Sequence, residues 1–151
     1  MAGCRAAAAV ALPLLAAVAI AAAGDMETSA GRWQVTRVEV NGKLVDQEFA
    51  DMLAVDYAAD GSWEVRLKGL PVGEGTSTVD EDSLPKAFEM ETLGAAGRRG
   101  RRYVGIYDTD GDARRLCFVS ADRPRPREFR STAAGGEILV ALRKNRVTSG
   151  R

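Results

Sequence analysis

Residues 52–68 read MLAVDYAADGSWEVRLK, and this stretch decides the fold class. Two runs of strand-forming residues, 52–57 and 62–68, flank a turn that contains Asp60-Gly61, which is the pattern of an antiparallel hairpin. In the second run tryptophan, valine and leucine alternate with charged residues. This period of two residues predicts a sheet with one face against a core and the other face in water.

The strand expected before this hairpin, residues 32–40, ends at the turn pair Asn41-Gly42. Its apolar residues change phase, from Trp33 and Val35 at odd positions to Val38 and Val40 at even ones. The change predicts a β-bulge near Thr36-Arg37, and a bulge bends a strand as a closing barrel requires.

Short strand patterns continue to the end of the chain, separated by glycine-rich and aspartate-rich turns. We expect them at residues 75–79, 87–92, 103–108, 114–120, 128–131 and 137–144. Strands that recur every 8 to 12 residues are typical of an antiparallel sandwich or barrel. Helical periodicity is limited to one or two turns within residues 45–52, so a parallel α/β fold is not expected.

The first residues have the pattern of a secretory signal peptide. Residues 6–23 contain only alanine, valine, leucine, isoleucine and one proline, they follow Arg5, and they end in small residues suited to cleavage. An uncleaved membrane anchor is the alternative, because about 18 apolar residues are at the lower limit for spanning a bilayer. We expect a signal peptide over residues 1–24, a short polar leader over 25–30, a barrel domain over 31–144, a flexible tail over 145–151, and a secreted or periplasmic protein.

Composition narrows the function classes. The chain has 21 basic and 21 acidic residues, and loss of a leader that contains Arg5 would leave a charge of −1, which favours neither nucleic acid nor an anionic membrane as a partner. No histidine occurs, so the usual zinc ligand and the usual general base at neutral pH are missing. We therefore expect no metal, no cofactor and no enzymatic activity. Cys4 would leave with the signal peptide, and Cys117 is expected to be a packed thiol without a disulfide partner.

Gly31 and Trp33 at the start of the first long strand, with Arg143 in the last strand, resemble the Gly-x-Trp and the distant arginine of lipocalin-type barrels. The resemblance implies that these three residues close one end of the barrel, with the arginine lying across the tryptophan. A closer resemblance is to the planctomycete-type lipocalin-like domain family, small exported bacterial domains of undetermined function. It rests on the motifs at residues 31–33, 41–43, 85–89, 105–107, 111–117 and 125–129. It implies an all-β, up-and-down antiparallel barrel of about eight strands.

A barrel of that size is either filled by side chains or holds one small ligand. We expect this one to bind a small apolar or amphipathic molecule. The residues expected near the pocket are the aromatic residues Trp63, Phe88, Tyr103 and Tyr107, with Arg125 at an anion-attracting rim.

Two other function classes remain open. A protein-interaction or inhibitor barrel could act through its loops, and Arg98 to Arg102, expected in a loop, would then contact a protein or an anionic surface. A carboxylate-only hydrolase would need two acids facing one pocket, for instance Glu64 with Glu89.

A calcium loop is not favoured at Asp108, Asp110 and Asp112, because Ala113 and Val119 stand where such a loop needs glycine and an acid.

Overall fold

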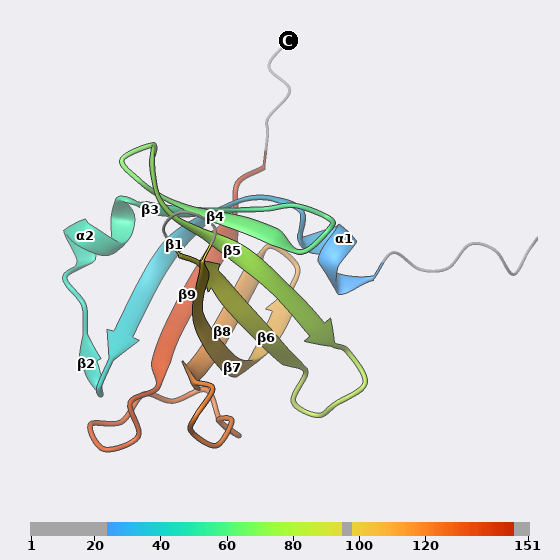
Figure 1. Cartoon of the computed structure of the whole chain (residues 1–151). Coiled ribbons are helices and arrows are strands. Elements are labelled where there is room, and N and C mark those ends of the chain that lie inside the picture. Colours follow the sequence, from blue (N-terminus) through green and yellow to red (C-terminus); the bar gives the residue numbers. More distant parts are fainter. Residues whose placement is uncertain (1–23, 95–97, 147–151) are drawn as a thin grey trace, which may run out of the picture.

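Strand β1 (Gly31–Val40) closes the sheet, because it pairs with strands from both ends of the strand order. It runs antiparallel to β3 (Leu53–Tyr57) through its first residues and to β9 (Ile138–Lys144) along most of its length. The computed structural model describes residues 24–94 and 98–146, and these form a closed barrel of eight strands, with the two-residue strand β2 (Lys43–Leu44) paired to the end of β1 (Figure 1).

The remaining strands pair in sequence order. After β3 come β4 (Ser62–Leu67), β5 (Leu70–Asp80), β6 (Ala87–Leu93), β7 (Arg99–Asp110) and β8 (Ala113–Ser120), each antiparallel to the next. The prediction of an all-β, up-and-down antiparallel barrel of about eight strands is therefore confirmed. The predicted signal peptide lies outside the described residues, apart from Gly24.

The predicted bulge in β1 is confirmed. The register with β9 shifts between Val35 and Arg37, so that Thr36 has no strand partner. Its exposed hydroxyl donates to the carbonyl of Ala141 at 3.1 Å. Because of the bulge, Trp33 and Val35 before it and Val38 after it all face the interior.

Two short helices lie on opposite sides of the barrel (Figure 1). Helix α1 (Asp25–Ser29) occupies the predicted polar leader, and helix α2 (Gln47–Asp51) falls within the stretch where helical turns were expected. The side chain of Asp46 caps α2 by accepting from the Phe49 amide at 3.2 Å, as an N-cap aspartate does. Ala50 of α2 is buried in the main core.

Residues 121–137 join β8 to β9 without a strand, so the prediction of a strand at 128–131 is wrong. This segment instead packs on the outer surface of β8. Phe129 lies under the guanidinium of Arg115, 4.2 Å from its central carbon, and the Arg130 carbonyl accepts from the Cys117 thiol at 3.5 Å. The Phe129 ring and the Arg130 carbonyl therefore face the outer surface of an existing sheet and do not form a new edge strand.

Because residues 121–137 cover the outer surface of β8, both faces of this strand are buried. Leu116 faces the interior, whereas Cys117 and Val119 face outward and are covered, with Cys117 fully buried. Burial raises the pKa of the Cys117 thiol, which keeps it protonated and unreactive at neutral pH. The geometry agrees with a packing role for this cysteine.

The first two residues of the predicted tail contact the barrel. The amide of Asn145 donates to the Arg32 carbonyl at 2.9 Å, and the side chain of Arg146 pairs with Asp112. Residues 147–151 lie outside the described part of the chain.

Candidate functional site

The interior of the barrel holds a cavity of about 330 Å³. This volume is at the lower end of the range of small-molecule sites. Almost all of the wall is aliphatic or aromatic, because the inward positions of every strand follow the apolar phase. The aliphatic wall is formed by Val35, Val38, Leu53, Val55, Val65, Val79, Met90, Leu116, Val140 and Leu142. An interior of this kind favours a ligand that is largely apolar.

Three of the four aromatic residues expected near a pocket line this cavity: Trp63, Phe88 and Tyr103. Tyr107 is not in the wall, although its buried ring meets Phe88 edge to face at a centroid distance of 6.3 Å. Phe118 is a wall residue that the sequence did not single out. It could have been found from its spacing, since it lies two residues beyond Leu116 on the inward face of β8.

Gly105 gives the aromatic wall its shape. It lies opposite Phe88 on one side and Phe118 on the other, and a Cβ at this position would come within 2.7 Å of both side chains. Without that Cβ, the two rings approach each other edge to face at a centroid distance of 6.1 Å, and Tyr103 meets Phe118 at 5.6 Å. Such contacts are favourable beyond the area that they bury.

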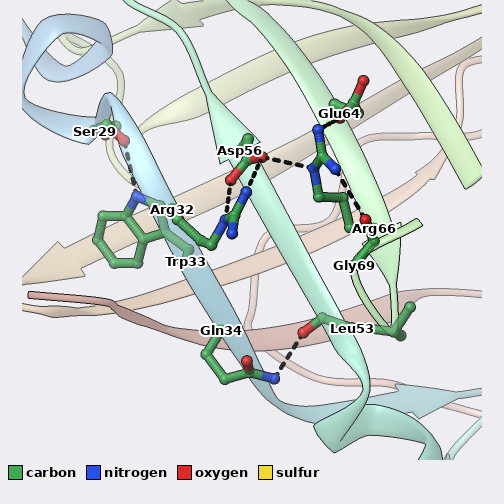
Figure 2. A network of polar contacts seen from close by, with 9 residues as sticks. All are labelled: Ser29, Arg32, Trp33, Gln34, Leu53, Asp56, Glu64, Arg66 and Gly69. Atoms are coloured by element: carbon green, nitrogen blue, oxygen red, sulfur yellow. Dashed lines mark hydrogen bonds and ion pairs between the residues drawn. The ribbon is translucent and has the colours of Figure 1, made fainter. Parts of the chain in front are cut away.

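Trp33 fills the closed end of the barrel. It is 1% exposed, and its indole nitrogen donates to the Ser29 carbonyl of α1 at 2.8 Å (Figure 2). The cation over its ring is Lys144, whose ammonium lies 5.7 Å from the ring centroid and donates to the Thr28 carbonyl at 2.8 Å.

Arg143 does not lie across Trp33, contrary to the expectation from the lipocalin resemblance. In β9 the side chains of residues 142 and 144 face inward, so Arg143 between them faces outward and is exposed. Gly31 has a φ of 123°, a conformation that L side chains rarely adopt, and the missing side chain leaves Lys144 Cε 3.4 Å from where its Cβ would stand.

Figure 2 shows how polar contacts on the outer surface hold β1, β3 and β4 beside this closed end. Asp56 accepts from Arg32 at 2.7 Å and from Arg66 at 3.0 Å, and Arg66 also pairs with Glu64. The bonds from Arg32 and Arg66 lower the pKa of Asp56 despite partial burial. Since this carboxylate bridges three strands, it helps to fix their register.

Helix α1 also closes the barrel through Asp25. One oxygen of its carboxylate accepts from the Tyr107 hydroxyl at 2.7 Å and from the Lys86 ammonium at 2.7 Å. Partial burial acts to raise the pKa of Asp25, but the bonds from Lys86 and Tyr107 outweigh it and the net shift is downward. Burial and the bond to Asp25 raise the pKa of Tyr107, so its hydroxyl stays protonated.

Arg114 was not among the site residues expected from the sequence. It is the one charged residue in the cavity wall among the described residues. It is 6% exposed, and its guanidinium lies 5.0 Å from the ring centroids of both Tyr57 and Tyr107. Its phase with Leu116 and Phe118 on β8 was the available signal. Ser77 and Thr92 are the other polar residues of the wall.

Arg125 lies away from the cavity, contrary to its expected place at a ligand-binding rim. It is exposed on the outside of the barrel, where it approaches Glu89 at 3.5 Å. Lys86 does not lie beside it, because its ammonium is bonded to Asp25 at the closed end.

The arginine-rich run is largely part of a strand and not of a loop, since β7 begins at Arg99. Arg98, Arg101 and Arg102 are exposed, and Arg102 lies 3.6 Å from Glu89. Tyr103 follows directly and faces the cavity, so the run lies at the end of the barrel opposite α1.

The carboxylate pair that a hydrolase would need is not formed in the described structure. Glu64 pairs with Arg66 and Glu89 approaches Arg102 and Arg125, all on the outer surface, and the cavity wall contains no acid. Asp108 pairs with Arg115 and Asp112 with Arg146, which agrees with the interpretation of this region as a turn. Within residues 24–94 and 98–146, no cluster of acids and cysteine could hold a metal ion.

Comparison with family models, with curated proteins and with solved structures found no match. The resemblance to the planctomycete-type lipocalin-like family therefore stays a prediction. Neither helix of the described chain has the length and apolar character needed to cross a membrane.

Proposed function

We propose that this chain is an exported, non-enzymatic barrel that binds one small apolar or amphipathic molecule in its interior. The observation that carries the proposal is the cavity of about 330 Å³ with an almost wholly apolar wall. Natural interiors are packed with few voids larger than a water molecule, so a space of this size is unusual unless something occupies it. Export is supported by the leader sequence alone.

Wall residues and their neighbours allow a matched test of binding inside the barrel. Ser77 of β5 faces the cavity, and Thr78 beside it is exposed on the outside. The neutral fluorophore N-phenyl-naphthylamine, titrated into the purified protein, should increase in emission as it enters an apolar site. Ser77→Phe fills the site and should weaken binding at least about tenfold, whereas Thr78→Phe should leave it unchanged.

Saturable binding that Ser77→Phe abolishes would support the proposal. Equal binding by both variants would place the dye outside the barrel, and absence of saturable binding to the unmodified protein would count against the function itself. Native mass spectrometry of the protein taken from its own host would then identify a retained small molecule.

A second candidate function is a contact with an acidic partner protein through the exposed side chains of Arg98, Arg101 and Arg102. These side chains gather three positive charges at one end of the barrel. The cavity makes this candidate the weaker one, because a barrel that acts only through its surface has no need of an open interior. Retention of a protein, and not of a small molecule, in the same mass spectrometry experiment would favour it.

A further inference from the structure

Arg114 is a buried cation, and part of its guanidinium forms no hydrogen bond with the described residues. It is the second residue of β8, at the end of the cavity covered by α1, and it is 6% exposed. Its Nε and Nη1 atoms have no hydrogen-bond partner among the described residues. A guanidinium carries five N–H donors and does not lose its charge in proteins. Two donor atoms are therefore buried next to the cavity without a partner among the described residues.

The surrounding groups supply no negative charge to this cation. None of the ion pairs formed by the described residues includes Arg114. Burial raises the pKa of Tyr57, and burial with the bond to Asp25 raises the pKa of Tyr107, so both rings under the guanidinium stay neutral. The Asp25 carboxylate, which accepts from the Tyr107 hydroxyl, also accepts from the Lys86 ammonium.

Contact with the two rings offsets only part of the cost of burying this charge. The attraction between a desolvated cation and an aromatic face is weaker than the penalty for burying an isolated ion, even after the protein relaxes. An anion that enters the cavity would meet a cation already stripped of water and held in place. A carboxylate suits this cation, because its oxygens accept charge-assisted hydrogen bonds from a guanidinium.

We propose that Arg114 anchors the carboxylate head of an amphipathic ligand, whose apolar tail extends along Leu116 and Phe118 toward the end of the barrel opposite α1. The inference rests on the proposed function, since it names the class of ligand that the cavity takes. The indole nitrogen of Trp63, another wall residue, is a second buried donor without a partner among the described residues.

The wall also limits how much charge and bulk the ligand carries. Arg114 is its one cation among the described residues, which suits a single negative charge better than the dianion of a phosphate monoester. A cavity of about 330 Å³ is small for a drug-sized ligand and suits one unbranched chain. The proposed class of ligand is therefore a carboxylic acid with a single aliphatic tail.

The test compares probes of equal chain length that differ in the head: decanoate, decanol and decyl phosphate. Isothermal titration calorimetry of the purified protein, first unfolded and refolded to release any retained ligand, should show decanoate binding about 10- to 100-fold more tightly than decanol. Arg114→Gln should reduce decanoate to the level of decanol and change decanol binding by less than about twofold. Arg114→Lys, which keeps the charge without the fork, should retain an intermediate preference.

Arg143→Gln is the matched control, because Arg143 is an exposed arginine on the adjacent strand and its loss changes the net charge equally. It should leave the preference for decanoate intact. Decanol binding also reports whether each variant has folded, and the comparison of probes in the unmodified protein requires no variant.

The possible outcomes separate the inference from the function on which it rests. Equal affinities for decanoate and decanol in the unmodified protein would overturn the role of Arg114 and leave the proposed barrel function standing. Tighter binding of decyl phosphate than of decanoate would overturn the carboxylate assignment. If no probe binds, the proposed function fails and the inference fails with it.

Discussion

Replacement of Arg114 by methionine should leave the free energy of unfolding of the ligand-free protein unchanged or raise it. Methionine resembles arginine in length and in flexible packing but has no donors and no charge. A residue kept for structure would lose stability on this replacement, and a residue kept for a ligand would not. The prediction therefore tests why the sequence places a charge in an apolar wall.

The magnitude follows from the contacts of the guanidinium. The substitution removes contacts with two rings at 5.0 Å, worth about 0.5–2 kcal/mol each. It also removes two buried donor atoms without partners, each of which costs about 1–3 kcal/mol. The ring contacts sum to about 1–4 kcal/mol and the unpaired donors to about 2–6 kcal/mol, so we expect the free energy of unfolding to be unchanged or to rise by up to about 2 kcal/mol.

Urea unfolding followed by tryptophan fluorescence measures this change, with both proteins refolded from denaturant so that retained ligand does not stabilise one of them. Leu116→Ala, two residues along the same inward face, calibrates the assay and should cost about 2–5 kcal/mol. A loss of 3 kcal/mol or more for Arg114→Met, as breaking a buried ion pair produces, would refute the reasoning. Arg114 would then be a structural residue.

Three further predictions concern the wall, the closed end and the covered outer face. Gly105→Ala should lower the free energy of unfolding by about 1–3 kcal/mol in the same urea assay, because its Cβ would come within 2.5 Å of the Cys117 carbonyl oxygen and within 2.7 Å of Phe88. Asp25→Asn should lower stability at neutral pH and less so in acid. The folded-state pKa of Asp25 lies below its ordinary value, so the stability that it contributes is present above about pH 4 and is lost as the pH falls through the folded-state pKa. The Cys117 thiol, which is 0% exposed, should react with a soluble disulfide reagent only as fast as the protein unfolds, as followed by release of the coloured thiolate.

Each of these predictions has an internal control. Gly73→Ala adds a Cβ with no atom within 4 Å and should be neutral, so equal losses at both glycines would contradict the account of the aromatic wall. Glu27→Gln removes one negative charge from α1 as Asp25→Asn does and serves as its control. If the difference in free energy of unfolding between Asp25→Asn and the unmodified protein stays constant down to about pH 3, titration of Asp25 is not its cause. Rapid reaction of Cys117 in the folded protein would mean that residues 121–137 do not cover it.

The parts of the fold that could be predicted from sequence are those where a strand has one wet face. Alternation in residues 62–68 and the change of phase at Thr36 identified the hairpin, the bulge and the closed barrel. The expected strand at 128–131 failed because its apolar phenylalanine packs on the outside of an existing sheet. A local pattern predicts that a side chain is buried, but not against which surface.

The orientation of Arg143 and of Arg114 was difficult to predict from the sequence for a related physical reason. Where both faces of a strand are buried, apolar residues occupy consecutive positions and the period of two residues disappears. In β8 this happens at Leu116, Cys117, Phe118 and Val119, so the apolar pattern leaves two phases open, and only the larger side chains of Leu116 and Phe118 favour an inward Arg114. In β9 the apolar run is also continuous, and the expectation taken from the lipocalin resemblance fell on Arg143, whereas Lys144 is the cation over Trp33.

The inward phase of Arg114 is therefore the feature that connects the fold to the function. A one-residue change of register would exchange it with Arg115, which has Asp108 beside it as a partner on the wet face. The fold has instead placed a cation without a counter-charge between two neutral rings, in a cavity whose other wall residues carry no charge. If Arg114→Met leaves the fold as stable as predicted above, the position of this charge is explained by the anion that we propose enters the cavity from outside the protein.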